Sequence, residues 1–239
     1  LLATLEAREP VDGAELAHRA SISPAEAQKA VEALVSQKRV MMLGDKGPHT
    51  LLFSAAGWQR LSATISAALA AYHRQFPLRS GMPREELRSK IKASSGSFPP
   101  MLQLLARDGV LVEEVKAVRL PSHRVQLNAS QKAVTDAYLE ALARSPYYPP
   151  SDLAIAPELL DVLIEQREVV KVADNVVFTA PAYREMLDRI MDRMKQNGKI
   201  TVAEVRDMFQ TSRKYAMAFM EHLDEQKVTR RVGDERVLR

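Results

Sequence analysis

The chain contains a pattern that occurs four times: an apolar helix, a short polar break, and a valine that opens a β-rich stretch. The four valines are Val40, Val110, Val169 and Val228, which are 70, 59 and 59 residues apart. The positions nine and five residues before each valine are apolar, and this spacing puts both on one buried helix face. A spacing near 60 residues is the length of a small domain, so the repeat predicts four tandem modules rather than a solenoid of single hairpins.

Further helices precede the repeated one and carry recognisable start signals. Asp12 with Glu15, and Thr201 with Glu204, have the spacing of capping boxes, and Pro83 suits the start of a helix in the second module. Two β runs follow each valine, as in VTRRV and RVL at the end of the chain. The order helix, helix, helix, strand, strand is that of a winged helix. We therefore predict a mainly α fold with small β-wings, built from four tandem winged-helix (helix-turn-helix) domains.

The domain boundaries are expected to follow the repeat. The predicted domains are residues 1–60 (winged helix 1), 61–126 (winged helix 2, with a long bridging helix at its start), 127–181 (winged helix 3) and 182–239 (winged helix 4). Residues 55–75 have Ala, Leu and Ile along one side and predict one long helix that bridges the first two modules. Trp58 is expected to pack in a core or between modules, and stacking on a base is the functional alternative.

The sequence contains no motif that indicates catalysis. The motifs GxxxxGK[ST], GxGxxG after a strand and GxSxG are absent, as is cysteine, so we expect no catalytic residue and predict a binder rather than an enzyme. The five histidines are scattered without metal-ligand spacing, so no metal site is expected. The lack of cysteine permits a reducing compartment, and no apolar run reaches the length of a membrane span, about 18 residues. We expect a cytoplasmic monomer that does not bind membranes.

The fourth module differs from the others in the charge at the start of its third helix. The net charge of +4 is too small to imply nucleic acid by itself. The third helices of the first three modules open with acidic or apolar residues, whereas the fourth opens with Thr211-Ser212-Arg213-Lys214-Tyr215. If Thr211 or Ser212 caps this helix, its free amides and positive dipole end would face a phosphate beside Arg213 and Lys214. The apolar stripe of the same helix is Ala216, Phe219, Met220 and Leu223, which would leave both cations near solvent. Two solvated surface charges are the alternative interpretation.

The predicted wing of the fourth module adds to this charge. From Lys227 onward five cations face two anions, a net charge of +3 at one end of the chain. If Gly233-Asp234 forms a two-residue turn, Val232 pairs with Glu235 and Arg231 with Arg236. Two arginines directly opposite one another repel, and a bound polyanion would remove that penalty. We therefore interpret the fourth module as a nucleic-acid-binding module, and charge alone does not distinguish RNA from DNA.

Residues 200–238 resemble the C-terminal winged helix of the SelB family of bacterial selenocysteine-specific elongation factors. The strings that carry the resemblance are ITVAEVRDMF, TSRKYAMAFMEHLD and VTRRVGDERVL. Independently, YHRQFPLRSGMPREELRSKI at residues 72–91 is similar to the second module of the same region. The resemblance covers the whole chain in architecture, although modules one and three match by pattern more than by string.

The resemblance implies the RNA-binding region of a translation elongation factor in protein biosynthesis. SelB-like proteins carry a GTPase portion that binds GTP, with Mg, and selenocysteinyl-tRNA, followed by four winged helices. None of the GTPase motifs occurs here and the chain begins with Leu1 rather than Met, so we expect a fragment without cofactors of its own. The terminal module of the family grips an mRNA hairpin, the selenocysteine insertion (SECIS) element, beside a UGA codon. The earlier modules would act as a spacer, and the ribosome and the tRNA would be partners of the full-length protein.

Carried over to this sequence, the resemblance implies two groups of RNA-binding residues. Ser212, Arg213, Lys214 and Tyr215 would hold the hairpin backbone. The wing residues Arg230, Arg231, Gly233 and Arg236 would approach the loop or a bulged base, where bases are read most easily.

Two other classes of function compete with this interpretation. A tandem winged-helix DNA-binding transcriptional regulator predicts basic reading helices in more than one module and usually dimer symmetry, and modules one to three lack such helices. A protein-interaction scaffold would leave the pairing of Arg231 with Arg236 unexplained.

Overall fold

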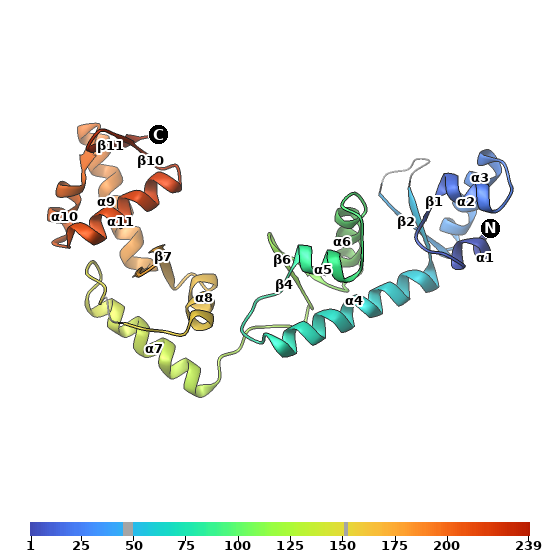
Figure 1. Ribbon diagram of the computed structural model, residues 1–239, viewed down its shortest axis with the longest axis horizontal. Helices are drawn as coiled ribbons and strands as arrows, with labels where there is room; N and C mark the ends of the chain where they lie inside the picture. Colours follow the sequence, from blue (N-terminus) through green and yellow to red (C-terminus); the bar gives the residue numbers. More distant parts are fainter. Residues whose placement is uncertain (45–49, 151–152) are drawn as a thin grey trace. The chain divides into compact units, whose positions relative to one another are not determined.

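The computed structural model describes residues 1–44, 50–150 and 153–239. The chain divides into two compact units, residues 1–125 and 126–239. Figure 1 shows the helices and strands of each unit. Each unit contains two of the modules that the repeat predicts, and the exact module boundaries within a unit stay a prediction. No described helix combines the length and the apolar composition needed to cross a membrane.

The first module has the elements of a winged helix. They are α1 (Leu2–Glu6), β1 (Val11–Asp12), α2 (Gly13–Arg19), α3 (Pro24–Ser36), β2 (Val40–Leu43) and β3 (Leu51–Ser54), with sheet order β1-β3-β2. The Oδ1 atom of Asp12 accepts the Glu15 amide at 2.7 Å, which caps α2 as the sequence predicts. Leu5, Leu16 and Leu52 are fully buried and close the core between the helices and the sheet.

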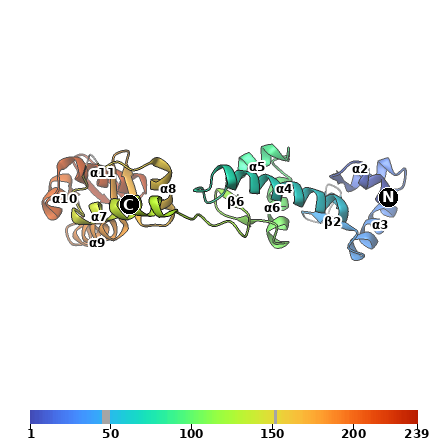
Figure 2. The ribbon, with the colours of Figure 1, turned by 90° about the horizontal axis from the view of Figure 1, so that it is seen from below.

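The second module follows without a break. It consists of α4 (Ala55–Gln75), β4 (Met82–Pro83), α5 (Arg84–Lys90), α6 (Phe98–Arg107), β5 (Val112–Glu113) and β6 (Ala117–Arg119), with sheet order β4-β6-β5. The prediction of one long helix over residues 55–75 is confirmed by α4. Buried residues of α4, α5 and α6 belong to one apolar cluster, and both shorter helices lie on the same side of α4 (Figure 1). Figure 2 shows these helices from below.

Trp58 lies in the core that joins the first two modules, so its predicted packing role is confirmed. It is 6% exposed, and its indole Nε1 donates to the Oδ2 atom of Asp108 at 2.9 Å. Its ring meets the edge of Phe53, from the wing of the first module, with 5.5 Å between the ring centroids. The same apolar cluster contains Leu43 from that wing and Leu102 from α6, so the wing of the first module packs into the core of the second.

The third module departs from the prediction. In the described part of residues 126–179 it has α7 (Ala129–Arg144), α8 (Pro157–Glu165) and a two-stranded sheet of β7 (Val169–Ala173) and β8 (Val176–Thr179). The count of four complete winged helices is therefore not confirmed. Between α7 and α8 the chain reads SPYYPP, and its prolines disfavour a helix because they lack the N–H donor and restrict the preceding residue.

The fourth module has the complete order. It consists of α9 (Ala180–Asn197), β9 (Ile200–Thr201), α10 (Val202–Phe209), α11 (Arg213–Glu225), β10 (Thr229–Val232) and β11 (Glu235–Leu238), with sheet order β10-β11-β9. The predicted capping box of Thr201 and Glu204 is confirmed in both directions. Its core also contains Phe178 and Val176 from the third module, so these two modules are packed together as well.

Candidate nucleic-acid interface

The start of α11 presents two exposed cations, Arg213 and Lys214. The sequence left Thr211 and Ser212 as candidate caps, and the structure assigns the cap to Ser212, whose Oγ atom accepts the Tyr215 amide at 3.4 Å. The apolar stripe is buried as expected, with 0% exposure at Ala216, Phe219, Met220 and Leu223. The Lys214 ammonium lies 5.5 Å from the centroid of the Tyr215 ring. This end of the helix therefore combines a positive dipole end with two accessible cations, as an anion site requires.

Tyr215 itself corrects the prediction that it holds the hairpin backbone. The residue is 4% exposed, and its hydroxyl donates to the carbonyl oxygen of Pro149 at 2.7 Å. Tyr148 meets the Tyr215 ring edge-on at 5.1 Å between centroids, and burial raises the pKa of the Tyr215 hydroxyl. The proline-rich segment before α8 thus covers Tyr215. Its role in this structure is to position α11.

The wing of the fourth module has the predicted turn and register. Strands β10 and β11 pair Arg231 with Arg236 and Val232 with Glu235. Gly233 has φ of +62°, the left-handed conformation that a two-residue hairpin turn requires and that glycine adopts without strain.

The surroundings of Arg236 contradict the argument that the pairing of Arg231 with Arg236 requires a bound polyanion. The Arg236 side chain is 2% exposed, and its Nε donates to the Oδ2 atom of Asp224 at 3.3 Å. Thr229 donates its hydroxyl to the other oxygen of Asp224 at 2.6 Å. The charge of Arg236 is therefore balanced inside the protein, and no bound polyanion is needed to relieve it. Arg236 is a core residue that attaches the wing to α11, not an RNA contact.

The wing still presents a positive surface. Arg230 and Arg231 are exposed, as is Gly233 at the turn. The Nε atom of Arg231 donates to the carbonyl oxygen of Gly233 at 2.8 Å, which holds the side chain along the turn. Val232, which lies between Arg231 and Gly233 in the sequence, is 47% exposed.

Of the eight predicted site residues, the structure thus leaves two groups at the surface. Ser212, Arg213 and Lys214 form the first, and Arg230, Arg231 and Gly233 form the second. The wing is attached to α11 at Asp224, eleven residues beyond Arg213, a distance of roughly 16 Å along the helix axis. An RNA that contacts both groups would follow the length of this helix.

Sequence reasoning missed the role of Asp224, and it named Thr211 only as a possible cap of α11. Asp224 could have been suspected because it follows the apolar stripe directly and precedes a wing with an uncompensated arginine pair. Thr211 is 7% exposed and donates its hydroxyl to the carbonyl oxygen of Tyr147. No local sequence signal points to that contact, since the two residues are 64 positions apart.

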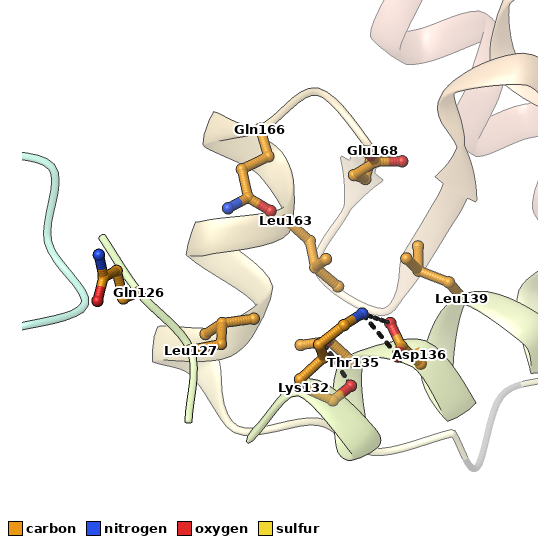
Figure 3. Close-up of a pocket in the computed structure, with 9 residues that line it drawn as sticks. All are labelled: Gln126, Leu127, Lys132, Thr135, Asp136, Leu139, Leu163, Gln166 and Glu168. Atoms are coloured by element: carbon orange, nitrogen blue, oxygen red, sulfur yellow. Dashed lines mark hydrogen bonds and ion pairs between the residues drawn. The ribbon is translucent and has the colours of Figure 1, made fainter. Parts of the chain in front are cut away.

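The other candidate sites among the described residues have fewer features that indicate a function. A hollow of about 540 Å³ lies between α7, α8 and the start of β7 (Figure 3), and none of the predicted site residues line it. Lys132 and Asp136 in its wall neutralise each other at 2.8 Å (Figure 3). Among the described residues no group of three His, Asp or Glu side chains could hold a metal ion. His49 lies outside the described residues.

Comparison with known proteins assigns two of the modules. Residues 192–238 and residues 66–120 match two family models that are both described as "Elongation factor SelB, winged helix". These two modules match SelB winged helices. The first match includes α10, α11 and the wing, and the resemblance that the sequence suggested is confirmed.

Two curated SelB relatives cover most of the chain. It is 27% identical over 185 residues to the selenocysteine-specific elongation factor of Desulfomicrobium baculatum, a match that spans 72% of this chain and 29% of that protein. It is 23% identical over 198 residues to the corresponding factor of Haemophilus influenzae, spanning 76% of this chain and 31% of the relative. The chain thus matches less than a third of the length of these SelB relatives.

Two solved structures also match. One is the mRNA-binding domain of SelB from E. coli in complex with SECIS RNA, at 20% identity and TM-score 0.40, covering 47% of this chain and 99% of that one. The other is a bacterial selenocysteine-specific elongation factor, EF-Sec, at 12% identity and TM-score 0.43, covering 86% of this chain and 33% of that one. Both TM-scores are below 0.5, so the assignment to SelB rests on the family models and the sequence relatives.

Proposed function

We propose that this chain is the RNA-binding region of a selenocysteine-specific translation elongation factor. Its terminal winged helix would bind the selenocysteine insertion hairpin of an mRNA, so that selenocysteinyl-tRNA is delivered at a UGA codon. The observation that carries the proposal is the pair of exposed cations, Arg213 and Lys214, at the capped start of α11 within a SelB winged helix.

Each exposed group has a distinct part in the proposed complex. Arg213, Lys214 and the free amides behind the Ser212 cap contact backbone phosphates of the hairpin, where charge and the helix dipole act together. Arg230 and Arg231 approach the loop or a bulged base, and the Gly233 turn allows the backbone to come close. Arg236 and Tyr215 act only by holding the wing and α11 in place.

The rest of the elongation factor supplies the other activities. In the proposal GTP, Mg, selenocysteinyl-tRNA and the ribosome are partners of the full-length, cytoplasmic protein, and this region acts by binding rather than by catalysis. The first three modules serve as a spacer between the GTPase portion and the mRNA.

Binding of three nucleic acids across a salt series tests this function. We expect the chain to bind an mRNA insertion hairpin more tightly than a sequence-scrambled hairpin or duplex DNA. Equal affinity for all three would contradict the proposal, and preference for duplex DNA would favour a transcriptional regulator.

The double variant Arg213→Ala, Lys214→Ala tests the residues at the start of α11. It should weaken hairpin binding and reduce the slope of log K against log salt by about one to two, because each lost phosphate contact removes about 0.7–0.9 from the slope. A matched control is Lys195→Ala with Arg206→Ala, two cations of the same module that pair with Asp192 and Asp207. An unchanged slope in the first variant would place the RNA site elsewhere.

A further inference from the structure

The second module is the most basic part of the chain. Residues 55–125 contain eleven Lys and Arg against five Asp and Glu, a net charge of +6, whereas residues 180–239 contain thirteen against ten, a net charge of +3. The C-terminal end is therefore not the only basic region of the chain. No Asp or Glu occurs between Ala55 and Arg84, or between Val115 and Thr135.

The two stretches without acidic residues meet at the C-terminal end of α4, beside the segment that follows β6 (Figure 1). The rings of His73 and His123 stack there, 3.6 Å between centroids and 7° from parallel. The Nε2 atom of His73 accepts the Leu120 amide at 3.2 Å, and Nε2 of His123 lies 2.8 Å from the carbonyl oxygen of Arg79. These contacts fix the two segments to each other, so the surface above them has a defined shape.

Three arginines surround this histidine stack. Arg119 and Arg124 both donate through Nη1 to the carbonyl oxygen of His123, at 3.4 and 2.7 Å. Two guanidinium groups therefore share one oxygen, although their charges repel. Arg79 lies with its guanidinium 4.3 Å from the centroid of the Phe76 ring. We call His73, His123, Arg79, Arg119 and Arg124 the His–Arg cluster.

Two arginines of the cluster, Arg119 and Arg124, have different kinds of partner. Glu114 pairs with Nε of Arg119 at 2.8 Å. Arg124 is exposed and donates through Nη1 to the backbone carbonyls of Pro121 and His123, which carry no net charge. These bonds use Nη1 and leave other N–H groups of the guanidinium directed elsewhere, since the group has five donors.

We propose that the His–Arg cluster is a second RNA-binding surface, which contacts the phosphate backbone of an RNA through Arg79 and Arg124. This goes beyond the proposed function because it involves neither α11 nor the terminal wing. Arginine suits this task because its planar fork binds phosphate oxygens in a bidentate manner.

The composition of the surface favours RNA over an acidic protein. The central part of a protein–protein interface is rich in apolar and aromatic groups. The exposed large apolar side chains of the described residues are Val115, Val134, Tyr148 and Val232, and none belongs to the His–Arg cluster. A fixed, positively charged surface without an apolar centre matches a polyelectrolyte, whose binding is driven by charge.

The test uses the full chain with its terminal site weakened by Arg213→Ala, Lys214→Ala, Arg230→Ala and Arg231→Ala. The probe is a duplex RNA without the insertion hairpin, titrated across a salt series. We expect residual binding, which Arg79→Gln with Arg124→Gln in the same background should weaken about three- to tenfold, with a salt slope lower by about one to two.

A matched control separates the cluster from diffuse charge. Arg60→Gln with Arg107→Gln removes two exposed arginines of the same module, and should leave the residual affinity unchanged. Arg79→Lys with Arg124→Lys should restore much of the binding, and the fluorescence melt of Trp58 should show that the Gln variant is folded.

Three results would overturn the second surface. They are loss of all duplex RNA binding in the background variant, equal weakening by the cluster and control variants, and tighter binding of poly-glutamate than of RNA at the same salt. None of them bears on the hairpin specificity of the wild-type chain, so failure here is distinguishable from failure of the proposed function.

Discussion

The second and fourth modules share one order of helices and strands but carry their accessible positive charge on different elements. In the fourth module it lies at the start of α11, behind a serine cap, and on the wing. In the second module α6 begins with the buried Phe98 and has no side-chain cap, and the charge lies at the end of α4 and after β6. The winged-helix fold therefore determines the core but not which elements carry the positively charged surface. For this reason the fold alone does not locate a binding site.

The wings of the two modules differ in the same way. In the second module, the arginines beside the wing are paired with its acids: Arg84 with Glu113 at 2.6 Å and Arg119 with Glu114 at 2.8 Å. In the fourth module the acidic residue that holds the wing is Asp224, which belongs to α11 and pairs with the buried Arg236. One wing uses ion pairs at its surface, and the other is anchored by an ion pair in its interior.

Removing the interior carboxylate should have the largest effect on stability. Asp224→Ala leaves Arg236 buried without its carboxylate, and we expect a loss of about 3–5 kcal/mol in the free energy of unfolding of residues 126–239. Urea denaturation followed by circular dichroism measures this. Trp58, the one tryptophan of the chain, lies in the other unit, so its fluorescence transition should stay in place.

The second wing supplies the comparison for that variant. Glu113→Ala breaks the partly exposed pair with Arg84 and should cost less than about 1 kcal/mol. If Asp224→Ala were no more damaging than Glu113→Ala, the contrast between an interior and a surface anchor would be wrong.

The His73–His123 stack should make the first unit sensitive to acid. Desolvation lowers the pKa of His73 to about 4, with smaller contributions from His123 and Arg119, and its buried Nδ1 has no hydrogen-bond partner among the described residues. Between the unfolded value, about 6.5, and 4 the unfolded chain binds a proton that the folded chain does not. Stability should therefore fall by about 1–3 kcal/mol as the pH drops through this window.

Urea denaturation followed by Trp58 fluorescence at pH 7 and pH 4.5 measures this loss. The control is His73→Gln, whose side-chain oxygen can still accept the Leu120 amide but does not titrate. The variant should show a smaller pH dependence than the wild type. Identical pH dependence in both proteins would show that His73 is not the responsible group.

Tyr215→Phe should have a smaller effect than the loss of Asp224 or the protonation of His73. It removes the hydroxyl that donates to Pro149 and leaves that carbonyl without this donor, at an expected cost of about 1 kcal/mol in stability. Affinity for the hairpin, measured where the variant is fully folded, should change less than twofold because the hydroxyl faces the protein. A loss of affinity as large as that of Arg213→Ala would return Tyr215 to the RNA surface.

Much of the fold could be predicted because the signals are local. The bounds of α4, the capping box of Thr201 and Glu204, and the register of Arg231 with Arg236 all follow from residues close together in the sequence. The identity of the exposed cations of α11 followed from the helical period in the same way.

What could not be predicted depends on contacts between distant residues. The burial of Arg236 depends on Asp224 twelve positions earlier, that of Tyr215 on Pro149 sixty-six positions earlier, and the His–Arg cluster on bonds across forty-seven positions. A count of charges per module would have shown the second module to be basic, but not that its arginines gather around a histidine stack.

The bonds from Thr211 to Tyr147 and from Tyr215 to Pro149 give the fourth module a mechanical connection to the third. They lie on either side of the residues proposed to hold the RNA backbone. Tension on a hairpin bound at Arg213 and Lys214 would therefore pass directly into the segment that follows α7. Under the proposed function, the third module would then carry mechanical load from the bound RNA in addition to acting as a spacer.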